Sequence, residues 1–210
     1  MEVFALGDTH IVNRAADILR SGGVILYPTD TLYGLGADAL SDTAVKKVRQ
    51  IKGRDEGKPI HAIVADLAMA VEYAEVNDVA RKLATKFLPG PLTLILKKKA
   101  GIKTGIAKGI NTFGIRIPDN RFCLDLAQEF RKPFTTTSAN LAGTKPERSV
   151  EKILTQLGER AELIDLVIDA GDPPAGGGER LPSTVVDVSE GELKILREGT
   201  IVQGVLVRAF

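Results

Sequence analysis

The segment 27–36 groups side chains that could hold a small polar ligand. The run Tyr-Pro-Thr-Asp-Thr is followed by Leu-Tyr-Gly-Leu-Gly, so hydroxyls, a carboxylate and two glycines share one predicted turn after an apolar strand. Glycine lets the backbone approach a ligand closely because it has no Cβ. Taken alone, the segment is better explained as a plain turn with satisfied hydroxyls. It is not a dinucleotide fingerprint, because its glycines do not lie directly between a strand and a helix.

The segment 52–59 concentrates positive charge at the end of a predicted helix. Lys52, Arg54 and Lys58 are interspersed with two glycines, and a strand is predicted directly afterwards. A triphosphate needs several donors, and Arg supplies a bidentate fork where Lys supplies a point charge. The segment therefore fits a polyphosphate grip, and the alternative is compensation of the helix dipole in a solvated loop. Because the turn is polar, we expect truncation of Lys52 or Arg54 to leave no cavity in the core.

Arg116 lies between Ile115 and Ile117 in a predicted buried strand. A charge there is costly unless it meets an anion. Successive strand side chains point to opposite faces, so if the isoleucines fill the core, Arg116 points to the other face. The anion is either a protein carboxylate in a structural ion pair or a ligand carboxylate held by the guanidinium fork. The sequence leaves both open.

Three further segments place polar side chains beside predicted strands. They are 135–140, which ends in Thr-Ser-Ala-Asn; 182–187, in which hydroxyls lead into a strand; and the charged turn 197–199. Ligands in open α/β sheets gather at strand ends. Helix caps and turns are the simpler explanation of each segment alone.

Short apolar strands and amphipathic helices that position these segments alternate along the chain. Helices are predicted over 11–19, after a Ser41 cap, and from an Asn77 cap to residue 87. Strands are predicted over 24–27, 60–65, 92–96, 113–117, 133–137, 163–168, 184–188 and 193–196. The glycine- and proline-rich stretch 171–182 is expected to be a loop, because too few residues follow it for a second core. We therefore expect one domain over 1–210, of the α/β (α+β) class, with a twisted mixed β-sheet flanked by helices.

Composition narrows the class of protein. The chain is 44% hydrophobic and 26% charged, with a net charge of +1, which is typical of a globular protein and unlike one built mainly to coat nucleic acid. No signal peptide or membrane-spanning segment is predicted. Two histidines and one cysteine make a zinc cage improbable, and Cys123 suits the core of a protein from a reducing cytoplasm.

The ordered set of motifs over about 18–201 resembles the YrdC family, the threonylcarbamoyl-AMP synthases, in its single-domain form. The matching elements are 27–36, the Lys-Gly-Arg triplet 52–54, Leu-Pro-Gly-Pro-Leu-Thr at 88–93, Gly-Ile-Arg-Ile-Pro at 114–118, Ser-Ala-Asn at 138–140, Ser-Thr-Val-Val-Asp at 183–187 and Arg-Glu-Gly at 197–199. Each motif alone is weak, whereas the ordered set is specific.

The resemblance implies a concave basic cleft and a reaction of L-threonine, bicarbonate or carbon dioxide, and ATP. Lys52 and Arg54 would carry the catalytic charge. ATP-binding positions are Lys52, Arg54, Lys58, Thr112, Asn140, Ser149 and Arg197. Threonine-binding positions are Thr31, Arg116, Ser138 and Ser183. Mg²⁺ would accompany the ATP phosphates, with no metal site formed by the protein itself.

The chain departs from the family pattern in three places. Asp55 stands where a proline often follows the Lys-Gly-Arg triplet, and the segment before Ser149 is one residue longer than usual. Some relatives carry a threonine-contacting histidine at the position of Ile63, whereas this chain has His61 two positions earlier. We therefore assign no threonine contact to His61.

Two alternative functions follow from the same motifs. One is a carbamoyl-adenylate-forming module of the hydrogenase-maturation type, which normally sits in much longer chains. The other is a non-enzymatic module that binds tRNA or double-stranded RNA, against which the near-zero net charge and 5% aromatic content argue. For the enzyme, we expect tRNA-modification proteins as downstream partners, tRNA or double-stranded RNA as a further candidate partner, and no membrane.

Overall fold

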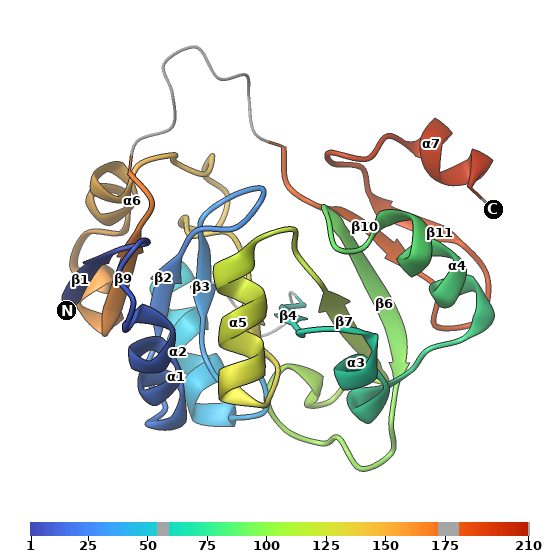
Figure 1. Cartoon of the computed structure of the whole chain (residues 1–210), viewed down its shortest axis with the longest axis horizontal. Coiled ribbons are helices and arrows are strands. Elements are labelled where there is room, and N and C mark those ends of the chain that lie inside the picture. The colour runs from blue at the N-terminus through green and yellow to red at the C-terminus, as the bar shows by residue number, and fades with distance from the viewer. Residues whose placement is uncertain (54–58, 172–180, 210) are drawn as a thin grey trace.

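The computed structural model describes residues 1–53, 59–171 and 181–209, in which helices and strands alternate along the chain (Figure 1). The helices are α1 (Ile11–Arg20), α2 (Asp42–Lys52), α3 (Leu67–Tyr73), α4 (Asp78–Phe87), α5 (Arg121–Phe130), α6 (Val150–Leu157) and α7 (Gln203–Arg208). The strands are β1 (Glu2–Ala5), β2 (Ile25–Tyr27), β3 (Gly34–Gly36), β4 (His61–Ile63), β5 (Ala74–Glu75), β6 (Leu92–Lys98), β7 (Thr112–Arg116), β8 (Phe134–Thr136), β9 (Leu166–Asp169), β10 (Thr184–Asp187) and β11 (Lys194–Arg197). Two 3₁₀ turns cover Gly105–Ala107 and Gly158–Leu163.

The strands form two sheets that meet edge to edge. Their orders are β1-β9-β2-β3 and β11-β10-β6-β7-β4-β8, with β5 beside β6. Both contain parallel and antiparallel pairs, which confirms the mixed α/β class. β3 and β8 join the sheets, because Leu35 N donates to Thr137 O at 2.9 Å and Thr135 N donates to Ala37 O at 2.8 Å. The segment 133–139 therefore links the two halves of the molecule.

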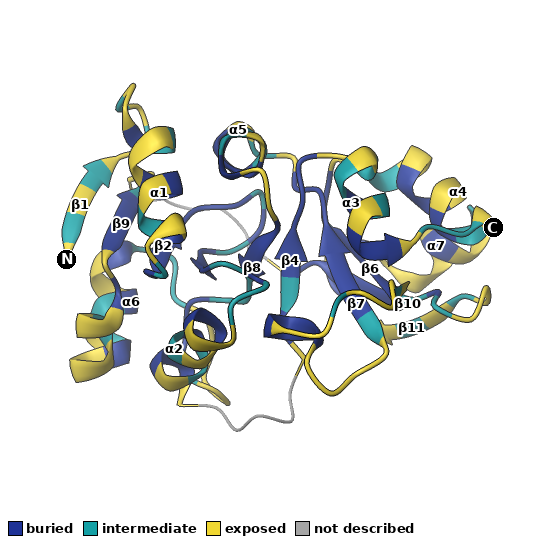
Figure 2. Cartoon of the chain, turned by 90° about the horizontal axis from the view of Figure 1, so that it is seen from below, coloured by how far each residue is buried: buried dark blue, intermediate teal, exposed yellow. Residues whose placement is uncertain are grey.

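Strand alternation divides the core into two clusters. Ile25 and Tyr27 of β2 belong to the cluster that α1 and α5 cover. Leu26 of β2 and Val24, just before the strand, belong to the larger cluster on the other side. The larger cluster includes the inward faces of α2, α3, α4 and α6. Figure 2 shows that the strands are mostly buried and that the helices turn exposed faces outward. Burial on both sides explains why the strands are short apolar runs.

The predicted caps are confirmed. Ser41 and Asn77 accept hydrogen bonds from the backbone N–H groups of Ala44 and Ala80, and so begin α2 and α4. The strand predicted over 163–168 begins only at Leu166, because the preceding residues form a 3₁₀ turn. None of the helices in the described ranges is long and apolar enough to cross a membrane.

The turn predicted over 27–36 is wrong in its second half, where Gly34–Gly36 forms β3. A Cβ on Gly34 would lie 2.9 Å from Tyr27 Cζ, and one on Gly36 would lie 2.8 Å from Ile25 Cγ1. These glycines make room for side chains of the neighbouring strand. Tyr27 is fully buried, and its hydroxyl donates to Thr135 O at 3.0 Å.

Candidate functional site

A cavity of about 310 Å³ lies where the α1–α5 layer stops covering the larger sheet. Register places Ile63, Arg116, Thr93 and Val185 in one row across β4, β7, β6 and β10. Ile63 packs in the core beneath α5, whereas the next three residues line the cavity. The volume is typical of a small-molecule site. The lining residues are Thr31, Leu32, Tyr33, Gly34, Pro59, His61, Thr93, Arg116, Thr136, Thr137, Ser138, Pro182, Ser183, Val185, Leu196 and Arg197.

Arg116 lies on the cavity side of β7, as strand alternation predicts, while Ile115 and Ile117 are buried in the larger core cluster. Its Nη2 donates to Asp30 Oδ1 at 2.6 Å, and the two side chains are 5% and 11% exposed. The first alternative, a protein carboxylate, is therefore realised, and the ligand alternative stays a prediction. Arg116 has a protein carboxylate as a partner and also faces a cavity that could hold a ligand.

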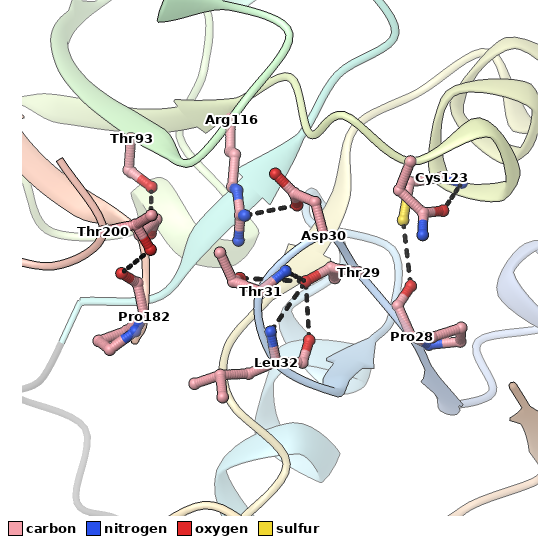
Figure 3. A network of polar contacts seen from close by, with 12 residues as sticks. Pro28, Thr29, Asp30, Thr31, Leu32, Thr93, Arg116, Cys123, Pro182 and Thr200 are labelled. Atoms are coloured by element: carbon pink, nitrogen blue, oxygen red, sulfur yellow. Dashed lines mark hydrogen bonds and ion pairs between the residues drawn. The ribbon is translucent and has the colours of Figure 1, made fainter. Parts of the chain in front are cut away.

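The loop between β2 and β3 presents Thr31 to the cavity, and Thr29 fixes that loop. Thr29 Oγ1 accepts from the N–H groups of Thr31 (3.0 Å) and Leu32 (3.2 Å) and donates to Leu32 O (2.7 Å). Figure 3 shows these bonds on one side of Asp30 and Arg116. Local hydrogen bonds of this kind hold a turn without help from a sheet ladder. The side chains around Arg116 are therefore held in place before any ligand arrives.

Ser183 and Arg197 form the opposite wall of the cavity. Ser183 Oγ lies 2.9 Å from Thr93 Oγ1, and Arg197 Nη2 donates to Ser183 O at 2.8 Å. The Arg197 side chain is exposed at the mouth, yet desolvation by the surrounding protein lowers its pKa, and the positive charge of Arg116 lowers it further. The two guanidinium groups are therefore close enough to interact. A Cβ on Gly199 would lie 2.2 Å from Pro182 O, so the tight turn after β11 requires glycine.

Lys52 is buried, which excludes the alternative interpretation of this residue as part of a solvated helix end. Its side chain turns inward from the end of α2 and is only 3% exposed. Lys52 Nζ donates to the carbonyl oxygen of Ser138, and to the carbonyl oxygen (3.0 Å) and Oδ1 (3.2 Å) of Asn140. Truncating Lys52 would therefore remove the donor for three oxygens, contrary to the expectation that truncation leaves the core intact. Arg54 and Lys58 lie outside the described residues.

Asn140 and Ser138 belong to the network around Lys52. Ser138 Oγ donates to Asn140 Oδ1 at 2.6 Å, and Asn140 Nδ2 donates to Leu141 O and Thr144 O. Ser138 also lines the cavity, so the Lys52 network and the Arg116 side meet there. The network orders the loop that follows β8.

Thr112 and Ser149 lie outside the cavity lining. Thr112 lines a second hollow of about 150 Å³, which shares Pro59, His61 and Leu196 with the first. Ser149 caps α6 by accepting from Lys152 N at 3.4 Å. The structure therefore gathers Thr31, Arg116, Ser138, Ser183 and Arg197 in one cavity. Lys52 and Asn140 adjoin it through Ser138, and Thr112 adjoins it through the second hollow.

Sequence reasoning missed Asp30, Thr93, Thr136 and His61 as residues of the site. His61 lies over Gly114, where a Cβ would come within 2.5 Å of His61 Cδ2. Thr93 and Arg116 are register partners on β6 and β7. Pairing between strands, which brings these residues together, leaves no local signal. Asp30, Thr93 and Thr136 lay in segments that the sequence analysis recognised, but none of them was assigned a role.

Two other predictions concern groups that react or bind metals. Cys123 is fully buried, its Sγ–H donates to Pro28 O at 3.4 Å, and burial raises the pKa of the thiol. The prediction of a core cysteine is therefore confirmed. Within residues 1–53, 59–171 and 181–209, no group of three or more His, Cys, Asp or Glu could hold a metal ion.

Comparisons with known proteins place this geometry in a family. The Sua5/YciO/YrdC family model, described as "Telomere recombination", matches residues 17–199. A protein of Methanocaldococcus jannaschii, provisionally named a threonylcarbamoyl-AMP synthase, is 41% identical over 183 residues, which is 87% of this chain and 83% of that protein. The threonylcarbamoyl-AMP synthase of Mus musculus is 39% identical over 198 residues, covering 92% of this chain and 68% of that protein. The crystal structure of P. abyssi Sua5 complexed with L-threonine superposes with a TM-score of 0.86 at 30% identity, over 99% of this chain and 60% of that longer chain.

Proposed function

Because this chain belongs to the Sua5/YciO/YrdC family, we propose that it is an L-threonylcarbamoyladenylate synthase. It forms threonylcarbamoyl-AMP and pyrophosphate from L-threonine, bicarbonate or carbon dioxide, and ATP, for the threonylcarbamoyladenosine modification of tRNA. The observation that carries the proposal is the buried, incompletely paired guanidinium of Arg116 in a cavity of amino-acid size. A relative of the same fold has been crystallised with L-threonine.

We assign the amino acid to the Arg116 side of the cavity. Arg116 would hold the threonine carboxylate, because a guanidinium pairs with a carboxylate through parallel hydrogen bonds. Thr31, Ser138 and Ser183 surround that position with hydroxyls that can either donate or accept. The carbamoyl-adenylate alternative gives Arg116 no comparable role, because carbamate carries no second anionic group.

We assign the nucleotide to the positively charged side of the site. Lys52 and Arg54 would stabilise the charge that develops on the phosphates, and Lys58, Asn140 and Arg197 would also contact the nucleotide. Thr112 and Ser149 would contact the remainder of ATP, and Thr112 lies on the second hollow next to the cavity. Fixed donors of this kind contribute more in a site that excludes water than in solution.

The reaction needs no nucleophile from the protein. The neutral amine of threonine attacks carbon dioxide, forms the N–C bond and releases a proton to give a carbamate. A carbamate oxygen then attacks the α-phosphorus of ATP, and the bond to the pyrophosphate oxygen breaks. Carbamate decomposes in water, so a cavity that orients substrates and limits solvent is what this chemistry requires.

Mg²⁺ enters the proposal with ATP as part of the substrate, because magnesium is usually held by substrate phosphates, water and one or two carboxylates. The proposal also includes a single YrdC-like domain over 1–210, tRNA-modification proteins downstream, tRNA or double-stranded RNA as a candidate partner, and a cytoplasmic location. Each of these rests on the family resemblance.

The decisive test is an omission assay for pyrophosphate release. We expect release only when L-threonine, bicarbonate and ATP are all present, with threonylcarbamoyl-AMP detected as the adenylate product. For variants of Arg116, the matched control in this assay is Arg121→Lys, because the Arg121 side chain is 87% exposed and pairs with Asp125 on α5. Equal release without threonine would overturn the assignment.

A further inference from the structure

The ion pair between Arg116 and Asp30 is only half formed. Arg116 Nη2 donates to Asp30 Oδ1, but Arg116 Nε and Asp30 Oδ2 are both buried without a hydrogen-bond partner among the described residues. A buried donor or acceptor without a partner is unfavourable and calls for a structural explanation.

The geometry of a guanidinium group supplies that explanation. Arginine can grip carboxylates along its side edge, formed by Nε and Nη2, and along its end, formed by Nη1 and Nη2. The atoms without partners, Nε and Oδ2, are those that a completed side-edge pair with Asp30 would join. The side edge of the Arg116 guanidinium thus faces Asp30, and its end is left to contact a ligand in the cavity.

We propose that Asp30 is a positioning residue, which holds the side edge of Arg116 so that the end of the guanidinium meets the carboxylate of the amino-acid substrate. The inference rests on the proposed function and deepens it. Asp30 acts through Arg116 and touches none of the reacting atoms.

The loop that carries Asp30 is built to hold this position. Thr29 fixes the backbone of the two residues after Asp30 through three hydrogen bonds, and Pro28 O accepts from the buried Cys123 Sγ on α5 (Figure 3). Asp30 is therefore held from both sides along the chain. A carboxylate placed so firmly can fix the plane of the guanidinium it pairs with.

Charge balance points to the same role. Arg116 and Arg197 interact electrostatically across the cavity, and Asp30 cancels one of their two positive charges. The pair of Asp30 and Arg116 is neutral as a unit, which suits a zwitterion such as a free amino acid, whose own charges also cancel. Without Asp30, the same cavity would favour simple anions.

A double-mutant cycle separates this role from a merely structural ion pair. The variants are Asp30→Asn, Arg116→Lys and both together, with Michaelis constants measured for threonine and for ATP. We expect Asp30→Asn to raise the threonine KM roughly 5- to 50-fold, in the range of one lost buried charged partner, with kcat and the ATP KM changing less than about 3-fold. In the Arg116→Lys background, the same substitution should change the threonine KM less than about 3-fold, because Asp30 acts only through the fork.

Direct binding supplies the second measurement. Binding is measured by calorimetry with L-threonine and with L-threoninamide, which lacks the carboxylate. Asp30→Asn should weaken the binding of L-threonine and leave the binding of L-threoninamide unchanged. Asp119→Asn, an exposed carboxylate just beyond β7, is the matched control. If Asp30→Asn fails to fold, Asp30→Glu, which keeps the charge, should fold and show the threonine-specific increase in KM.

The outcomes separate the inference from the proposed function. An unchanged threonine KM in the folded variant, or an equal loss in both Arg116 backgrounds, would overturn the positioning role. Failure of the wild-type protein to bind threonine at all would overturn the proposed function itself.

Discussion

The regions around Lys52 and Arg116 both bury a cation, but they surround it with different partners. Lys52 donates to oxygens of Ser138 and Asn140 and so orders the loop that follows β8. Arg116 faces the carboxylate of Asp30, so its region is neutral as a unit. The neutral pair of Arg116 and Asp30 suits a zwitterion, whereas the Lys52 network reaches the same cavity through Ser138.

The comparison predicts its largest effect at Lys52. We expect Lys52→Ala to lower turnover roughly 30- to 1,000-fold, which corresponds to about 2–4 kcal/mol of lost charge stabilisation. The variant should also lose about 1–3 kcal/mol of unfolding free energy, because buried oxygens of Ser138 and Asn140 lose their donor. Pyrophosphate release and urea unfolding measure the two losses separately.

Lys46→Ala is the matched control for this prediction, because Lys46 is exposed on the same helix. It should leave turnover and stability nearly unchanged. A stable Lys52→Ala variant with wild-type turnover would contradict the predicted role of Lys52.

The next largest effect is expected at Arg116. Arg116→Lys keeps the charge but loses the fork, so the threonine KM should rise roughly 5- to 150-fold while the ATP KM changes far less. Steady-state kinetics with each substrate varied in turn decides this. An increase confined to the ATP KM would show that Arg116 serves the nucleotide and not the amino acid, and would contradict the prediction.

The Arg116 region should also resist changes in volume. Gly114→Ala would place a Cβ 2.5 Å from His61 Cδ2 and 2.9 Å from Ile95 Cδ1. We expect a loss of about 1–3 kcal/mol in unfolding free energy, because a packed strand cannot move aside. Gly101→Ala, with nothing within 4 Å of the new Cβ, is the control for urea unfolding. Equal stabilities would show that His61 can move without cost.

The smallest effect is expected at Arg197, which is exposed. Arg197→Ala should raise the ATP KM roughly 2- to 5-fold, because an exposed charge contributes little. The effect should shrink further as salt increases. A titration of KM against ionic strength tests this, and a loss as large as that of Lys52→Ala would contradict the ranking by burial.

Local chemistry was predictable from the sequence. The caps at Ser41 and Asn77 and the alternation around Arg116 depend on neighbours within four residues, and all three are confirmed. The edge strand β1 and helix α5 were not predicted, although both are present.

Contacts between distant segments account for the errors. Truncation of Lys52 was expected to leave the core intact because the turn around it is polar, whereas its partners lie more than 80 positions later. The glycines at 34 and 36 were placed in a turn, whereas they lie in a strand and accommodate Tyr27 and Ile25 of the paired strand. Asp30, the partner of Arg116, was not singled out for the same reason.

The parallel pairing of β10 with β6 also has a consequence for biosynthesis. Thr184 pairs with Leu92, roughly 90 positions earlier. The start of β10 and the end of β11 bring Ser183 and Arg197 to the cavity. At about 5–20 residues per second, a ribosome needs roughly 5–20 s to extend the nascent chain from one strand to the other. During that interval the apolar β6 lacks its β10 neighbour, which makes it a candidate for chaperone capture. The cavity can therefore be completed only late in translation, after most of the sheet has already emerged.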